Sequence, residues 1–339
     1  MKQLQAFANA THTPVGYMFL PKPPEERLPV PDFRTVANAA VGRASPDLLD
    51  TVYQCQQRQE WYRGYAQLHG EPSVSFVATL ARSDGRIKAA RKMRDVLGFD
   101  PVDRGRSWSE ALRRLTASAE DNGVLVMISG VVGSNTHRKL DPQEFRGFAL
   151  CDDLAPLIFV NGADTKAAQI FTFVHELVHL WLGQSAVSDV DMKRTSTNAT
   201  ERWCNQVAAE FLVPAELLTD AGLDIEHLTE GLDRLARQFK VSTLVVLRCV
   251  FDAGMLTDDQ YRHAYEDELK RVKELIEERT STGGDFYKTQ PARVGKRFAR
   301  ALIQSTLEGQ TLHRDAFQML GFKKHATFLE LAHRLGVEH

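Results

Sequence analysis

The chain has 339 residues, which is enough for two or three domains with a substantial hydrophobic core. Its formal net charge of −2 provides no global basic character that would favour nucleic-acid binding. The cysteines are scattered without a CxxC pair, which predicts that they are reduced. The sequence shows no signal peptide and no apolar run of about 18 residues, so we expect a cytoplasmic protein that does not enter a membrane.

Residues 1–35 combine a short helical pattern with a proline-rich stretch. The sequence reads KQLQAFANATHTPVGYMFL from residue 2 and then PKPPEERLPVPDFRT. It resembles the end of an XRE-type helix-turn-helix domain, of which only the last helix or two is present. The alternative is a helical cap followed by a linker. In both cases we expect no direct DNA binding, because the helices that would present a recognition helix are missing.

The regular spacing of apolar residues predicts that residues 36–122 are mainly helical. It predicts helices over residues 47–69, 84–97 and 107–119. Three apolar runs come next, and their composition predicts strands at residues 124–128, 145–150 and 157–160.

A further helix is predicted over residues 165–182, with Asp164 as its N-cap and Gly183 just past its end. The run HELVH occupies residues 175–179 of this helix. The helix is apolar on nearly every side, so burying the two histidines and the glutamate is costly unless a partner satisfies them. One explanation is a core helix whose polar side chains have ordinary hydrogen-bond partners.

The other explanation is a metal site. Residues four apart share a helix face, so His175 and His179 can reach one metal ion. Glu176 is then placed to accept a proton from a water molecule on that metal. This is the pattern of a zinc hydrolase.

A third protein ligand would leave one position of a tetrahedral site open for water. The best candidate is Glu201, on a second predicted helix that stops before Pro214. Asn205 lies four residues further on the same face and is placed to hold a ligand imidazole. A competing explanation makes Glu201 the N3 residue of a capping box with Asn198 as N-cap. Cys204 lies off this face and is expected to pack, and the weaker ligand candidates are Glu210, His227 and Asp191.

The two helices together carry a family resemblance. HELVHLWLG followed by ERWCNQVAAEFLVP resembles the ImmA/IrrE-type metallo-endopeptidases, whose pattern is HExxH and then E-x-x-x-N-x-x-A-x-x-x-L-x-P. The Glu-x-x-x-Asn part is also similar to the Glu-x-x-x-Asp of thermolysin-like gluzincins. The resemblance implies one Zn²⁺ per chain, held by His175, His179 and Glu201, with Glu176 as the general base.

The same resemblance implies an α+β fold that is mostly helical, with a zincin-like (gluzincin) core in which a small sheet packs on the HExxH helix. An edge strand, residues 145–150 or 157–160, would then bind an extended peptide. The implied substrate is a protein, an XRE-type repressor whose cleavage relieves transcriptional repression. Hydrolysis would also need an oxyanion donor, for which His137 is available.

Two non-enzymatic alternatives stay open. The chain could be a transcriptional regulator or antitoxin-like partner that uses the zinc fold as a binding scaffold. It could also be a structural or sensor zinc domain. The presence of Glu176 argues against the second, because a structural site has no need of a base.

The rest of the chain is predicted to be connections and helices. Residues 184–200 are polar and aperiodic, as in a connection that covers a cleft. Residues 232–253 have helix-turn-helix spacing with Ser242 as an N-cap, but the second helix is too apolar for a DNA groove, so packing is favoured. A charged helix at residues 258–279 follows. Two or three short helices are expected after residue 285, with a basic cluster that we read as a solvated face, made of Lys288, Arg293, Lys296, Arg297 and Arg300.

These patterns divide the chain into five parts. The first is the helix-turn-helix remnant with its linker, and the second a helical N-terminal part. The third is the peptidase core, the fourth the helix-turn-helix-like element with the charged helix, and the fifth a C-terminal helical region. Their predicted bounds are residues 1–35, 36–122, 123–222, 223–280 and 281–339.

Overall fold

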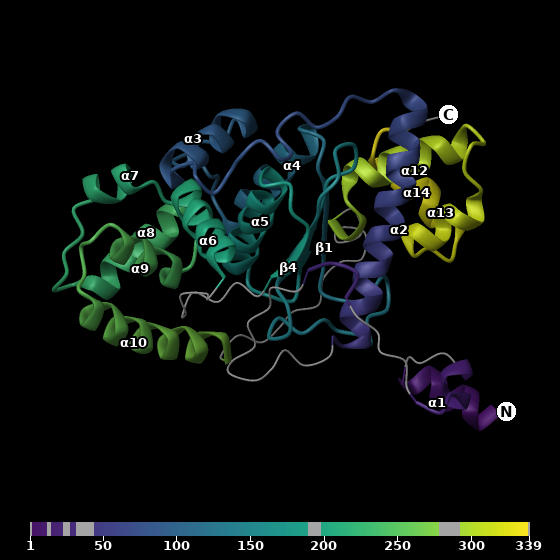
Figure 1. Ribbon diagram of the computed structural model, residues 1–339, viewed down its shortest axis with the longest axis horizontal. Helices are drawn as coiled ribbons and strands as arrows, with labels where there is room; N and C mark the ends of the chain where they lie inside the picture. The colour runs from purple at the N-terminus through teal and green to yellow at the C-terminus, as the bar shows by residue number, and fades with distance from the viewer. Residues whose placement is uncertain are drawn as a thin grey trace.

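The computed structural model describes residues 2–11, 15–22, 28–31, 44–188, 198–277 and 292–337. In these ranges helices surround one mixed sheet of four strands (Figure 1), which confirms the predicted α+β, mostly helical fold. No helix in this part of the chain is both long and apolar enough to cross a membrane. At the N-terminal end lie α1 (Lys2–Thr11) and a 3-10 helix, η1 (Val15–Phe19).

The sheet contains β1 (Leu125–Ser129), β2 (Gly147–Leu150), β3 (Leu157–Asn161) and β4 (Ala186–Ser188) in the order β1-β3-β2-β4. β1 runs parallel to β3, whereas β2 is antiparallel to both β3 and β4. The edges of the sheet are therefore β1 and β4.

The prediction that residues 145–150 or 157–160 form the edge that binds a peptide is wrong, since both runs lie inside the sheet. The reason is β4, which lies in the stretch expected to be an irregular connection. Its register pairs Phe148 with Val187 and Gly147 with Ser188, so β4 covers the side of β2 that would otherwise be open.

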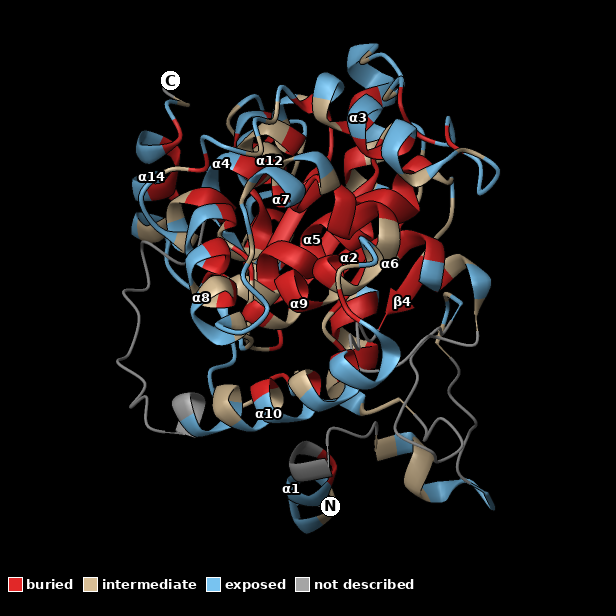
Figure 2. Ribbon diagram, turned by 90° about the vertical axis from the view of Figure 1, so that its left-hand side faces the viewer, coloured by how far each residue is buried: buried red, intermediate tan, exposed pale blue. Residues whose placement is uncertain are grey.

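Successive side chains of a strand point to opposite faces of the sheet, and each face belongs to a different hydrophobic cluster. Ala149, Ile158 and Val160 join a cluster with the apolar residues of α5 (Lys166–Trp181). Phe148 and Phe159 point the other way and join a second cluster. The sheet is thus a central layer covered on both faces, and Figure 2 shows buried residues concentrated around α5.

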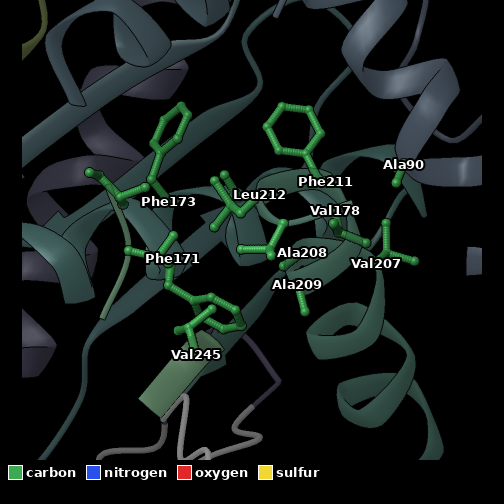
Figure 3. Close-up of a cluster of buried hydrophobic side chains, with 14 of the residues drawn as sticks. Ala90, Phe171, Phe173, Val178, Val207, Ala208, Ala209, Phe211, Leu212 and Val245 are labelled. Atoms are coloured by element: carbon green, nitrogen blue, oxygen red, sulfur yellow. The ribbon is translucent and has the colours of Figure 1, made fainter. Parts of the chain in front are cut away.

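The face of the sheet on which α5 lies is covered by helices that come before and after α5 in the sequence. α6 (Ala199–Leu212) packs on α5, and Figure 3 shows one apolar cluster that contains Phe171 of α5, Val207 of α6 and Val245 of α9 (Thr243–Asp252). The remaining helices of this half are α3 (Arg86–Leu97), α4 (Trp108–Asp121), α7 (Ala215–Asp220), α8 (Leu228–Phe239) and α10 (Asp258–Glu277).

The helix-turn-helix-like pair, α8 and α9, serves packing, as predicted. The Ser242 hydroxyl accepts a hydrogen bond from the Val245 N–H and begins α9. Most of α9 is buried, including Val246 and Leu247, so this helix has no free face for a DNA groove.

The opposite face of the sheet is covered by α2 (Pro46–His69), α12 (Lys296–Leu307), α13 (His313–Leu320) and α14 (His325–Arg334). In Figure 1 the three C-terminal helices lie beside α2, on the far side of the sheet from α5 and α6. Gly295 lies directly against β1, because a Cβ at this residue would come within 2.6 Å of the Val126 carbonyl oxygen.

The described part of the basic cluster joins α12 to neighbouring helices rather than forming a purely solvated face. Arg297 Nη2 lies 2.8 Å from Oε2 of Glu71, two residues after the end of α2. The backbone N–H groups of Lys296 and Arg297 donate to Glu120 Oε1 of α4. Lys288 lies outside the described residues.

Candidate metal centre

The helix that carries the HExxH run begins one residue later than predicted. Thr165 is its N-cap, with Oγ1 accepting from the Ala168 N–H, while Asp164 accepts from the N–H of Thr165. The helix ends at Trp181, and Gly183 follows with a φ of 72°, a conformation that glycine adopts without strain. The caps set where the helix begins and ends, and its period places the histidines one turn apart on one face.

His175, His179 and Glu201 come together at one point. Glu201 Oε2 lies 3.1 Å from His175 Nε2, and Glu201 Oε1 lies 3.1 Å from His179 Nε2. The two Nε2 atoms are themselves 3.1 Å apart. All three residues are buried, the histidines fully and Glu201 with only 4% exposed. This buried group can bind a metal ion.

The packing of α6 on α5 directs Glu201 into the site. Asn198 is the N-cap of α6, and its side chain accepts from the Thr200 N–H. The Glu201 carboxylate contacts both imidazoles, so it does not turn back to the start of its own helix as the capping-box explanation requires.

Electrostatics favour the ionised carboxylate in this group. Burial opposes the ionisation of Glu201, but the charges and hydrogen bonds of His175 and His179 outweigh it and lower the pKa of Glu201. Burial also lowers the pKa of His179, which favours the neutral imidazole. An ionised carboxylate and a neutral imidazole, as favoured for Glu201 and His179, are the protonation states that bind a metal ion.

Glu176 lies beside the cluster without a hydrogen-bond partner. It is fully buried, and neither carboxylate oxygen has a partner in hydrogen-bond geometry among the described residues. Burial and then the charge of Glu201 raise the pKa of Glu176 well above its ordinary value, while the nearby Ser188 hydroxyl lowers it. The carboxylate is therefore a stronger base than an exposed glutamate.

The other predicted site residues lie apart from this cluster or do not bond to it. Asn205 is half-buried on α6, and its Oδ1 has no hydrogen-bond partner among the described residues. The backbone N–H of Ala215 hydrogen-bonds the Glu210 carboxylate. His227 is exposed and pairs with Asp224 at 3.0 Å. Asp191 falls outside the described residues.

His137, the available oxyanion donor, is placed elsewhere. It is exposed and lines a cavity of about 710 Å³ with residues of α2 and α13, such as Gln54 and Phe317. The described structure thus gives no support to an oxyanion role for His137.

Cys204, which the sequence places next to the site as a packing residue, has its Sγ 3.9 Å from His179 Nδ1. Sequence reasoning missed Ser188 at the site. This residue carried no sequence signal, because its approach to Glu176 depends on the pairing of β2 with β4.

At Gly147 the sheet lies close against the HExxH helix. A Cβ here would lie 2.6 Å from Thr172 Cγ2, 2.9 Å from the Phe159 carbonyl oxygen and 3.2 Å from Glu176 Cγ. Gly147→Ala is therefore expected to push β2 and α5 apart and to lower the free energy of unfolding by about 1–3 kcal/mol, measured by denaturant titration.

Gly64→Ala is the matched control, because this exposed glycine of α2 has no neighbour within 4 Å of a built Cβ. It should change the free energy of unfolding by no more than about 1 kcal/mol, towards greater stability. Equal effects of the two substitutions would contradict the close approach at Gly147.

Two stretches of the chain match known protein families. Residues 119–250 match the IrrE N-terminal-like domain of peptidase family M78, and this stretch contains the whole His175–His179–Glu201 cluster. Residues 294–334 match a domain of unknown function, DUF8813. No curated protein matches the chain. Neither family match reaches residues 1–35, so the helix-turn-helix remnant stays a prediction.

Proposed function

We propose that this chain, with its IrrE N-terminal-like domain, is a zinc-dependent endopeptidase that cleaves a helix-turn-helix transcriptional repressor. The observation that carries the proposal is the buried His175–His179–Glu201 group with the unpartnered carboxylate of Glu176 beside it. A purely structural site would not need that second buried carboxylate.

Zinc is the metal that these residues fit best. Two imidazole nitrogens and one carboxylate oxygen form a donor set used by catalytic zinc sites. Donor atoms bonded to zinc at about 2.0–2.1 Å in a tetrahedron are separated by roughly 3.3 Å. The separations of 3.1 Å between the Nε2 and carboxylate oxygen atoms are close to that value.

The residues of the chain divide the chemistry between them. Bound zinc supplies a Lewis acid that polarises the scissile carbonyl and makes a water molecule more acidic. Glu176 accepts the proton of the attacking water and passes it to the leaving amine. The apolar shell around α5 keeps other water away, which strengthens the electrostatic interactions of the site.

The substrate is proposed from the resemblance of the two ligand helices to ImmA/IrrE-type peptidases. The family match supports a metallopeptidase, and the resemblance of the two ligand helices suggests an XRE-type repressor as the partner. Cleavage of such a repressor would control gene expression.

Removal of the metal tests this function. Zinc-loaded protein incubated with a candidate XRE-type repressor from the same organism is expected to produce a discrete cut, visible by gel electrophoresis and mass spectrometry. A chelator should abolish the cut and added zinc should restore it, because the open coordination position is needed for the reaction. Cleavage that persists in the metal-free protein would contradict the proposal.

A further inference from the structure

The outer edge of β4 is occupied by a segment from the N-terminal part of the same chain. The Val187 N–H donates to the Pro31 carbonyl at 3.0 Å. Leu28 and Val30 are half-buried and pack on the cluster that contains Val187, while Pro29 and Pro31 are exposed. The chain bends at Pro29 and Val30, so the segment covers this edge through two apolar side chains and one hydrogen bond rather than as a paired strand.

The occupied edge passes close to Glu176. Gly147 and Ser188 are register partners and so share a face of the sheet, the face on which Glu176 lies. Val187 is the neighbour of Ser188, about 3.3 Å along the strand, and a chain paired with this edge lies about 4.8 Å from it. An extended peptide bonded to Val187 is thereby led past Glu176.

From these contacts we infer that residues 28–31 occupy the edge on which the substrate peptide adds, so that the segment and the substrate compete for Val187. The inference rests on the proposed peptidase function. The chain's own segment shows what this edge accepts, namely a backbone carbonyl bonded to the Val187 N–H and apolar side chains two residues apart, like Leu28 and Val30.

The occupant is suited to being displaced. Pro29 and Pro31 have no amide hydrogen, so at these two positions the segment can accept a hydrogen bond but cannot donate one. The N–H and C=O of one strand residue point to the same side, so the Val187 carbonyl also faces outwards. A substrate without proline there has donors that the segment lacks.

The test releases the segment by placing charges on its apolar contacts. In the full-length double variant Leu28→Asp with Val30→Asp, hydrogen exchange of the Val187 amide should become faster. The KM for a peptide substrate should fall on the order of 10-fold, because one hydrogen bond and two packed side chains no longer compete. The kcat should be unchanged, since no residue beside the metal cluster is altered.

Two further variants keep the result interpretable. Leu20→Asp is the matched control, because this residue lies in the same N-terminal part and is 48% exposed. It should change neither the exchange rate of the Val187 amide nor the KM. Leu28→Ala with Val30→Ala removes the packing without adding charge, and it replaces the charged variant if that variant fails to fold. It should likewise speed exchange of the Val187 amide and lower the KM.

A synthetic peptide of residues 27–33, RLPVPDF, provides a readout that does not depend on activity. It should bind the double Asp variant, slow exchange at Val187 again and inhibit competitively, whereas RDPDPDF should not. Unchanged exchange at Val187 in both released variants, or faster exchange with an unchanged KM, would overturn the inference. If the protein cleaves no peptide, the proposed function is contradicted instead. Hydrogen exchange at Val187 and peptide binding then still show whether residues 28–31 occupy the edge of β4.

Discussion

Glu176→Gln is expected to keep zinc at one ion per chain and to lower the rate of peptide cleavage by roughly 10²–10⁴-fold or more. Glutamine has nearly the same shape, so the packing of α5 is kept, but its amide cannot accept the proton of the attacking water. Metal content by mass spectrometry and cleavage rate would be measured on the same preparation.

Glu210→Gln is the matched control for this substitution. Glu210 is also a largely buried glutamate, with 6% exposed, but it is not part of the metal-binding group. Its substitution should leave cleavage nearly unchanged. Retained cleavage in Glu176→Gln would show that another group moves the proton.

Glu201→Ala is expected to act on the metal itself. It removes one of three protein ligands, so the affinity for zinc should fall by more than the 10–100-fold typical of losing a residue that only supports a ligand. Zinc occupancy after dialysis against a competing chelator measures this loss, and cleavage should fall with occupancy.

Two variants separate the possible causes of a lower zinc occupancy. Glu210→Ala should retain zinc, because that carboxylate is bonded by the Ala215 N–H instead. Asn205→Ala tests whether this residue supports the site, and a loss of about 10–100-fold would show that it does. Full occupancy in Glu201→Ala would mean that the third ligand is another residue.

The sequence was sufficient to predict the parts of the site that depend on local order. His175, Glu176 and His179 lie in one helix, and a helix has a period and caps that can be read from neighbouring residues. Even there the N-cap was wrong by one residue, since Thr165 rather than Asp164 accepts the bond. Adjacent cap-forming residues offer the helix two similar starts.

What could not be predicted depends on contacts between distant residues. β4 has three residues, too few for an alternating pattern to stand out, and its pairing with β2 joins residues about forty positions apart. The approach of Ser188 to Glu176 and the true edge of the sheet both follow from that pairing. A residue such as Asn205 was assigned by helix face alone, and the face does not decide which atoms meet.

The helices that cover the second face of the sheet, α2, α12, α13 and α14, are not all synthesised before it. Phe148 and Phe159 belong to the strands, whereas Phe298 and Phe328, which share their cluster, are synthesised after them. At about 5–20 residues per second, that face has only α2 to cover it for on the order of ten seconds before α12, α13 and α14 are made. During that interval the nascent sheet is a target for chaperones, and a chain shortened before α12 would remain one.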